Sequence, residues 1–165
     1  MSRVFLSLGS NLRDRLAYLR AATSALARGP RMSLLGISKV YETAPVEVEE
    51  EQPDYLNCMV EMECSLSAVE LLRYCQGIEV ALGRDDKGTK TPRTVDLDVL
   101  LFGGEVIEVP DLTVPHPGIT RAFNLRGLAD LAPDLYVPGR GVVADLLSEA
   151  DLRGVKQMVE AGALC

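Results

Sequence analysis

Residues 91–103, TPRTVDLDVLLFG, constrain the fold of this chain more than any other stretch. Their alternation predicts a buried strand with one apolar face, which carries Val95, Leu97, Val99 and Leu101. Asp96 and Asp98 begin the opposite face and lie side by side, because side chains two apart on a strand point the same way. Two like charges held this close are costly unless one is protonated or a cation lies between them.

Carboxylate oxygens suit a hard cation such as Mg²⁺, which binds through one or two carboxylates together with substrate phosphates. Arg93 lies just before the pair, and the preceding segment adds further positive charge from Arg84, Lys87 and Lys90. In a chain of net charge -7, this local excess indicates phosphate binding and phosphoryl transfer. The alternative is an ordinary charged surface loop followed by two solvated aspartates at a strand end.

Composition narrows the class of protein. The chain has 165 residues, 47% of them hydrophobic and 25% charged, which suits a single domain over residues 1–165 with a sizeable core. A pI near 4.8 argues against binding to nucleic acid or to anionic membrane by charge. No apolar run is long enough to span a bilayer and no signal peptide is recognisable, so we expect a cytoplasmic protein.

Histidine and cysteine usage limits the available chemistry. His116 is the only histidine, which leaves little material for a histidine-based zinc site or a Ser-His relay. No C-x-x-C spacing occurs, and we expect reduced, mainly structural cysteines at Cys58, Cys64, Cys75 and Cys165.

The order of elements predicts an α+β fold of the ferredoxin-like βαββαβ type. Strands are expected over 3–9, 32–41 and 55–64, with the aspartate strand as the fourth. Asn11 is expected to cap the first helix, and Ser67 with Glu70 forms a capping box for the second. Such a sandwich places both helices on one side of an antiparallel sheet and leaves the other side free.

A further β segment and two helices are expected after the aspartate strand. The β segment lies near residues 106–109, and the helices run over about 119–132 and 142–149. These helices would form a C-terminal helical extension to the sandwich.

Polar residues outside the aspartate strand suggest a ligand pocket. Tyr55 and Asn57 share the non-core face of the third strand and, with the loop residues Thr43, Pro45 and Val46, could line a pocket for a flat heterocycle. Each is also an ordinary strand or loop residue when considered alone.

Two more positions have both a functional and a structural interpretation. Gln76 and Glu79 share one helix face and could bind ribose or base, although an exposed helix surface is the commoner role for such a pair. His116, between two prolines, could donate to a phosphate or serve as a structural turn residue.

Together these motifs resemble the 6-hydroxymethyl-7,8-dihydropterin pyrophosphokinase family of folate biosynthesis. The matching signatures, in family order, are LSLGSN (6–11), VYETAPV (40–46), QPDYLN (52–57), the Gln76/Glu79 pair followed by LGR (82–84), PRTVDLDVLLFG (92–103) and LTVPHP (112–117). The resemblance covers nearly the whole chain, and the family's fold is the ferredoxin-like sandwich.

The resemblance implies transfer of pyrophosphate from MgATP to the hydroxymethyl group of the dihydropterin, with release of AMP. It implies two Mg²⁺ ions at Asp96 and Asp98, with Arg93, Lys87 and Lys90 as further catalytic residues. It places ATP at Gln76, Glu79, Arg84, Val99, Thr113, His116 and Arg121. It places the pterin at Thr43, Ala44, Pro45, Val46, Tyr55, Asn57 and Phe123. We expect a monomer whose partners are these two small molecules.

The chain departs from the family pattern in the loop before PRT. The family typically has a tryptophan and an arginine there, whereas this chain has no tryptophan and a loop one residue shorter. This interpretation assigns the role of the arginine to Lys87 or Lys90. The rival hypotheses are another two-metal transferase on the same fold, a metabolite-binding module without turnover, and a family member that has lost activity.

Overall fold

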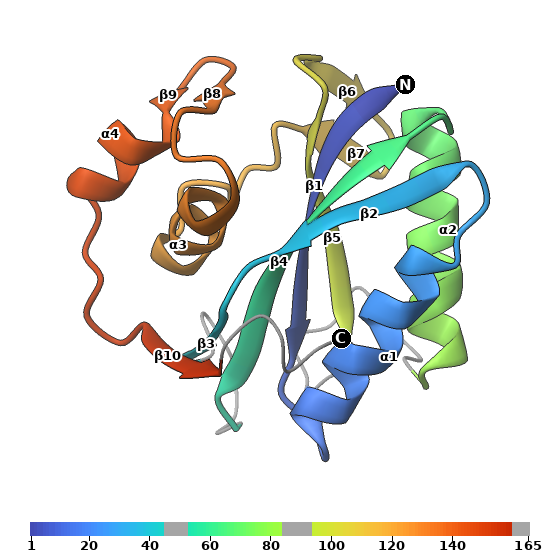
Figure 1. Cartoon of the computed structure of the whole chain (residues 1–165), viewed down its shortest axis with the longest axis horizontal. Helices are drawn as coiled ribbons and strands as arrows, with labels where there is room; N and C mark the ends of the chain where they lie inside the picture. The colour runs from blue at the N-terminus through green and yellow to red at the C-terminus, as the bar shows by residue number, and fades with distance from the viewer. Residues whose placement is uncertain (45–52, 84–93, 160–165) are drawn as a thin grey trace.

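The computed structural model describes residues 1–44, 53–83 and 94–159. The elements are β1 (Ser2–Ser10), α1 (Arg15–Ala27), β2 (Met32–Ile37), β3 (Val40–Thr43), β4 (Tyr55–Cys64), α2 (Ala68–Ala81), β5 (Asp96–Phe102), β6 (Ile107–Val109), β7 (Leu112–Val114), α3 (Ala122–Leu131), β8 (Tyr136–Val137), β9 (Gly141–Val142), α4 (Val143–Ser148) and β10 (Lys156–Val159). The main sheet has the strand order β10-β3-β4-β1-β5, and β2 also pairs with β4 (Figure 1).

Strand β1 lies between β4 and β5 in this antiparallel sheet. It pairs with β4 along its whole length, from Ser2 opposite Cys64 to Ser10 opposite Leu56, and with β5 on its other side. The predicted strand over 55–64 matches β4 residue for residue. The pairing of β1 with both neighbours therefore fixes which residues of the three strands share a face.

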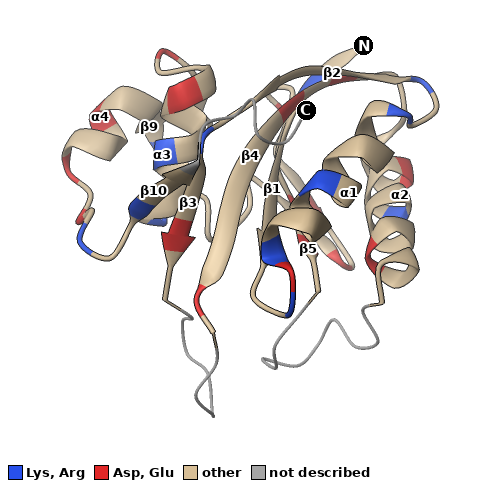
Figure 2. Cartoon of the chain, turned by 60° about the horizontal axis from the view of Figure 1, so that its bottom comes forward, with Lys and Arg blue, Asp and Glu red and all other residues tan. Residues whose placement is uncertain are grey.

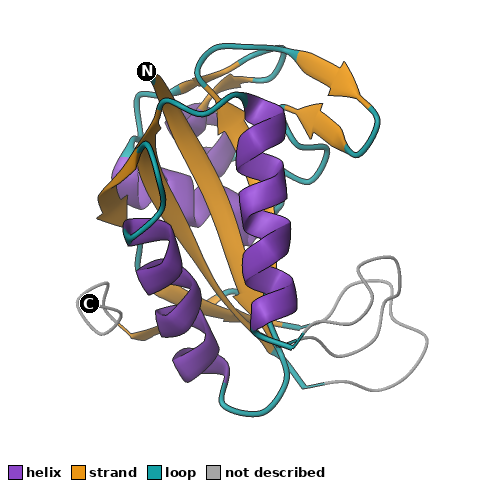
Figure 3. Ribbon diagram, turned by 90° about the vertical axis from the view of Figure 1, so that its right-hand side faces the viewer, coloured by secondary structure: helices purple, strands orange, loops and turns teal. Residues whose placement is uncertain are grey.

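One face of the sheet is covered by α1 and α2, which lie across it in Figure 3. Apolar side chains of both helices and of the strands form the larger core, for example Leu19, Leu71, Leu97 and Val60. The Ser67–Glu70 capping box is present as predicted.

The N-cap prediction for α1 is wrong. The cap is Asp14, whose side chain accepts a hydrogen bond from the Ala17 N–H. Asn11 is instead fully buried, and its Nδ2 donates to the Pro53 carbonyl at 3.2 Å. This bond connects the turn after β1 to the start of β4.

The sequence predicted that the opposite face of the sheet would be free, and this prediction is wrong. Helix α3 packs against β4 and β3 on that face. A second core forms there around Phe5, Met59, Leu100 and Leu128. The helix expected from about residue 119 begins at Ala122, and Ile119 before it is a fully buried member of this core. The apolar half of the face is thus covered, whereas the polar half carries Asp96, Asp98 and Asn57.

A β-bulge in β5 corrects the predicted alternation. Leu6 pairs with Val99 and Phe5 with Leu101, so Leu100 has no counterpart in the β1 register. As a result Leu101 joins Leu100 in the α3-side core, while Phe102 takes the expected position of Leu101 in the helix-side core. The bulge reverses the face of every residue that follows it.

The strand predicted over 32–41 is divided into β2 and β3 at Ser38. The Ser38 N–H donates to the Met59 carbonyl at 2.8 Å, and its hydroxyl accepts the Met59 N–H at 2.7 Å. A serine side chain thus replaces a backbone partner at the break. Both segments remain hydrogen-bonded to β4.

A polar contact attaches α3 to β3. The Tyr41 hydroxyl donates to Asp130 Oδ2 at 2.6 Å, and the Arg126 guanidinium lies 4.8 Å from the centroid of the Tyr41 ring. The Tyr41 side chain is only 1% exposed. Burial, together with the hydrogen bond to the Asp130 carboxylate, raises the pKa of Tyr41 to about 12.

Surface charge and the cysteines agree with an ordinary folded domain. The charged residues of α1 are basic, whereas α2 carries both acidic and basic residues (Figure 2). Cys58, Cys64 and Cys75 are buried, and burial raises the pKa of the Cys58 thiol to about 12. Cys165 lies outside the described residues. Among the described helices, none is both long and apolar enough to cross a membrane.

We predict that Tyr41→Phe lowers the free energy of unfolding by about 1–3 kcal/mol at pH 8, because a hydrogen bond to a carboxylate is lost. The folded pKa of about 12 exceeds the ordinary value of 10.0, so this stabilisation is present below pH 10 and is lost as pH rises through 12. The difference in stability between wild type and variant should therefore shrink between pH 8 and pH 11, as measured by urea unfolding.

Tyr136, whose side chain is 61% exposed, provides the control. Tyr136→Phe should change the free energy of unfolding by less than about 0.5 kcal/mol. A Tyr41→Phe variant as stable as wild type at pH 8 would contradict the proposed contact.

Candidate active site

The polar half of the α3-side face is organised in rows across three strands. Gly9 of β1 pairs with Asp96 of β5 on one side and with Asn57 of β4 on the other. Ser7 pairs with Asp98 and with Met59 in the next row. Adjacent strands are about 4.8 Å apart, so the Cα atoms of Asp96 and Asn57 are separated by about 10 Å across Gly9.

Gly9 provides a floor without a side chain between these groups. A Cβ at this position would lie 2.9 Å from Asn57 Oδ1 and 3.3 Å from Tyr55 Cδ1. The Tyr55 and Asn57 side chains therefore lie over the β1 backbone, as strand glycines often permit. The Asn57 amide is fixed by a bond from its Nδ2 to Thr43 Oγ1 at 2.7 Å, which directs its oxygen over Gly9.

One ion pair and two further hydrogen bonds hold this end of the sheet together. The Arg15 guanidinium donates to Glu42 Oε2 at 2.7 Å and to the Asp54 carbonyl at 2.9 Å. With the Asn11–Pro53 bond, these contacts join the end of β3, the start of β4 and the beginning of α1. The residues around Asn57 are thereby positioned from three elements.

Asp98 opens into a cavity of about 290 Å³. The lining includes three further residues predicted for the site, Val99, Thr113 and His116. His116 Nε2 lies 3.8 Å from Asp98 Oδ1, and both side chains are about one-third exposed, at 31% and 35%. The other lining residues are Leu72, Leu97, Val109, Asp111, Leu112 and Pro117.

The tautomer of His116 follows from its local hydrogen bond. Its Nδ1 accepts the Gly118 N–H at 2.9 Å, so the proton of the neutral imidazole is on Nε2, the atom that faces Asp98. The His116 N–H in turn donates to the Leu100 carbonyl at 3.0 Å. The turn that carries the histidine is thus attached to the strand that carries the acids.

Several predicted site residues occupy other surroundings. Arg121 is the N-cap residue of α3, and a Cβ at Gly118 would lie 3.3 Å from both Arg121 Nε and His116 Nδ1, so the two side chains are close. Phe123 lies in the first turn of α3, half-buried. Ala44 is exposed at the end of β3. Pro45, Val46, Arg84, Lys87, Lys90 and Arg93 lie outside the described residues.

Glu79 differs from the exposed helix-surface role that was the commoner expectation. It is only 2% exposed, and its Oε2 accepts the Leu97 N–H at 2.9 Å. Gln76, one turn earlier, is half-buried and accepts a hydrogen bond from Arg73 at 2.9 Å. The two residues therefore have different roles despite their common helix face.

Sequence reasoning also missed two residues of the site, Gly9 and Asp111. Gly9 carried a usable signal, because a glycine inside a strand often marks a close approach. The sequence around Asp111 gave no signal of a role in the site. Asp111 lies in the turn between β6 and β7, where its φ is 70°, and it lines the cavity. Within the described residues, no group of three or more His, Cys, Asp or Glu side chains forms a metal cluster.

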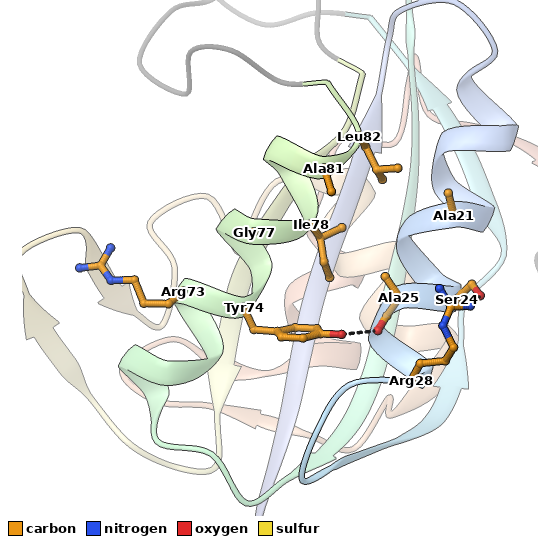
Figure 4. A pocket seen from close by; sticks show the side chains of 10 residues that line it. All are labelled: Ala21, Ser24, Ala25, Arg28, Arg73, Tyr74, Gly77, Ile78, Ala81 and Leu82. Atoms are coloured by element: carbon orange, nitrogen blue, oxygen red, sulfur yellow. Dashed lines mark hydrogen bonds between the residues drawn. The ribbon is translucent and has the colours of Figure 1, made fainter.

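A second, larger cavity of about 540 Å³ lies between α1 and α2, on the face away from Asp98 (Figure 4). Small side chains such as Ala21 and Ala25 line it, and the Tyr74 hydroxyl crosses it to donate to the Ala25 carbonyl at 2.7 Å. Among the described residues, none of the acids or predicted ligands of the site line it. The smaller cavity is therefore the better candidate.

Two acids on one face of a strand, one of which lines a cavity beside a histidine N–H donor, are suited to phosphoryl-transfer chemistry. The sequence model of the 7,8-dihydro-6-hydroxymethylpterin-pyrophosphokinase (HPPK) family matches residues 5–133. The chain belongs to this family.

Individual members of the family are similar to this chain over most of its length. A 2-amino-4-hydroxy-6-hydroxymethyldihydropteridine pyrophosphokinase from Pseudomonas aeruginosa is 36% identical over 159 residues, covering 96% of this chain and 98% of the relative. The protein of the same name from Bacillus subtilis is 44% identical over 128 residues, or 77% of this chain and 76% of the relative.

Solved structures support the fold. The HPPK-DHPS protein of Plasmodium falciparum matches with a TM-score of 0.72 at 13% identity, over 95% of this chain. The match spans 47% of that longer chain. At this identity the likeness bears on the fold alone.

We predict that Gly9→Ala destabilises the protein by about 1–3 kcal/mol, because the added methyl group overlaps Asn57 and Tyr55. Urea unfolding would measure this loss. Gly104→Ala is the matched control, since a Cβ there meets no atom within 4 Å. Equal stability of the two variants would contradict the close approach over Gly9.

Proposed function

We propose that this chain transfers pyrophosphate from ATP to the hydroxymethyl group of 6-hydroxymethyl-7,8-dihydropterin and releases AMP, as a step of folate synthesis. Family membership supports the reaction. The observation that carries the proposal is the row Asp96–Gly9–Asn57, which separates an acidic side from a hydrogen-bonding side by one bare glycine. Two substrates can meet over that floor.

The dihydropterin is assigned to the Asn57 side. Asn57 Oδ1 lies over Gly9, where it can accept an N–H of the pterin ring, and Thr43 holds the amide in this orientation. Tyr55 provides a flat apolar side, and the family resemblance adds Ala44, Pro45, Val46 and Phe123. Gly9 allows the Asn57 and Tyr55 side chains to lie over the β1 backbone, where both can contact the ring.

ATP is assigned to the cavity beside Asp98. Its apolar walls, including Leu72 and Val99, suit a base and sugar, and Thr113 with His116 offers donors. The resemblance adds Gln76, Arg84 and Arg121 to this side and Arg93, Lys87 and Lys90 to the transferring phosphates. Asp111 adds a carboxylate at the rim that can accept hydrogen bonds from hydroxyl groups.

Asp96 and Asp98 fit Mg²⁺, because two partly exposed carboxylates share one face of a strand. We assign two Mg²⁺ ions to this pair. When bound, the metal neutralises triphosphate charge and polarises the phosphorus under attack. The chain's own contribution is to hold the two substrates in line over Gly9, which alone can supply much of the acceleration.

His116 acts as a neutral hydrogen-bond donor in this proposal. Its Nδ1 is occupied by the Gly118 N–H, so Nε2–H is directed to the side of the cavity where phosphate oxygens would lie. A donor that is already oriented stabilises charge developing on the phosphates without reorganisation.

The fold type is assigned from the strand order and the placement of the helices. The order β5-β1-β4 with β2 and β3 on the outer side of β4, and both α1 and α2 on one face, supports the ferredoxin-like description of the core. A single domain over residues 1–165, a monomeric state and a cytoplasmic location stay predictions.

The decisive experiment incubates the chain with MgATP and 6-hydroxymethyl-7,8-dihydropterin and identifies the products by mass spectrometry. We expect AMP and the pterin pyrophosphate. ADP would indicate ordinary kinase chemistry and contradict the proposal. Tight pterin binding without turnover would instead favour a binding module or an inactive family member.

Asp96→Ala and Asp98→Ala should each lower kcat by about 10³-fold, since the assigned metal ligands are lost. Steady-state kinetics and far-UV circular dichroism would show that activity falls while the fold survives. Glu105→Ala, an exposed acid after the same strand, should leave kcat unchanged. Full activity in both aspartate variants would refute the metal assignment.

His116→Gln and His116→Asn should differ in activity. A glutamine amide can place an N–H near the original Nε2, whereas asparagine reaches only the Nδ1 position. We expect a loss of kcat of about 10-fold for Gln and about 10²-fold or more for Asn, in steady-state assays. The opposite order would mean that the wrong nitrogen has been assigned as the donor.

A further inference from the structure

Glu79 carries a carboxylate in an unusual position near the end of α2. It is only 2% exposed, although glutamates are almost never fully buried without a specific partner. Its Oε2 accepts the backbone N–H of Leu97 at 2.9 Å. Leu97 is the residue between Asp96 and Asp98.

The geometry of the sheet explains why this bond is available. Strand β5 is the last strand of the sheet order beyond β1. Asp96 and Asp98 pair with Gly9 and Ser7 of β1, and backbone groups of successive residues in an antiparallel pair point alternately toward and away from the partner. The Leu97 N–H is directed away from β1 and meets Glu79. The strand is therefore held by β1 on one side and by Glu79 on the other.

Docking of α2 does not require this carboxylate. Leu71, Leu72, Cys75 and Ile78 of the helix are already buried in the helix-side core. The Glu79 carboxylate lies at the outer edge of β5, where its hydrogen bond fixes the peptide group between the two acids. Ligand sets tolerate misplacement of only about 0.5 Å, so the backbone of this tripeptide is a sensitive point.

We infer that Glu79 is a positioning residue, which holds the Leu97 peptide so that Asp96 and Asp98 keep the spacing and direction needed for Mg²⁺. This inference rests on the proposed function. It differs from a direct ATP contact, which the family resemblance implied for Glu79. The role depends on an oxygen acceptor and not on the negative charge of the side chain.

Two substitutions distinguish the hydrogen-bond acceptor of Glu79 from its negative charge. Glu79→Gln keeps an oxygen that can accept the Leu97 N–H, whereas Glu79→Ala removes it. We expect Glu79→Ala to lower kcat about 10–100-fold and to raise the Mg²⁺ concentration for half-maximal activity about 10-fold, as for other residues that orient metal ligands. The Kd for the dihydropterin, from fluorescence titration, should change less than about twofold, since the Asn57 side of the site is untouched. Glu79→Gln should stay within about threefold of wild type.

Val80→Ala is the matched control, because Val80 is the next residue of α2 and is 70% exposed. It should equal wild type in kcat, Mg²⁺ dependence and pterin affinity. A purely structural role of Glu79 would instead lower stability and pterin affinity together in Glu79→Ala, and that result would overturn the inference.

Hydrogen exchange tests the same contact without activity. By NMR, the Leu97 amide should be protected in the wild type and in Glu79→Gln, and should exchange at least about tenfold faster in Glu79→Ala. If Glu79→Ala fails to fold, comparison of the wild type with Glu79→Gln still decides. Rapid exchange of the Leu97 amide in the wild type would overturn the inference. So would a Glu79→Gln variant in which the Leu97 amide stays protected but ATP binds more weakly.

Failure of the inference and failure of the proposed function can be distinguished. A wild-type protein that forms no AMP contradicts the proposed function. A wild-type protein that forms AMP, with the Mg²⁺ dependence of Glu79→Ala unchanged, contradicts only the role of Glu79.

Discussion

The simultaneous pairing of β1 with β4 and β5 is the constraint on which the site depends. It places Gly9 opposite both Asp96 and Asn57, so the carboxylate side and the amide side of the candidate site lie on either side of one backbone. A slip of one residue would turn the acids into the helix-side core, where each buried charge costs several kcal/mol. Burial of Leu97 and Val99 in that core therefore fixes the direction of the carboxylates.

The two faces of the sheet divide the work of folding and function. The helix-side core extends over α1, α2 and most of the strands, and it specifies the register. The α3-side core is smaller and covers only the apolar half of its face. The Tyr41–Asp130 contact attaches α3 next to Asn57, since Tyr41 and Asn57 are paired across β3 and β4. The site lies where the cover of α3 ends.

Local signals predicted the parts of the fold that depend on neighbours in the chain. The alternation of β4 and the Ser67–Glu70 capping box were predicted correctly because each is complete within a few residues. Asp98, Thr113 and His116 line one cavity, and the roles that the family resemblance implied for them stay predictions.

Features that depend on distant partners were not predictable. Glu79 is buried because Leu97 offers an N–H from another element, and nothing in the sequence of α2 indicates this. The division between β2 and β3 depends on Met59, and the cover by α3 depends on Phe5 and Met59 of the sheet. Asp111 enters the cavity only because a hairpin turn places it there.

The bulge at Leu100 has a consequence for how β5 can vary. Residues before it follow one phase of alternation and residues after it follow the other, so the strand consists of two independent halves. The first half presents the acids, and the second half anchors Leu101 beneath α3 and Phe102 beneath the opposite helices. Changes in the anchoring half can therefore accumulate without rotating the carboxylates out of the site, which insulates the chemistry from drift in the packing that supports it.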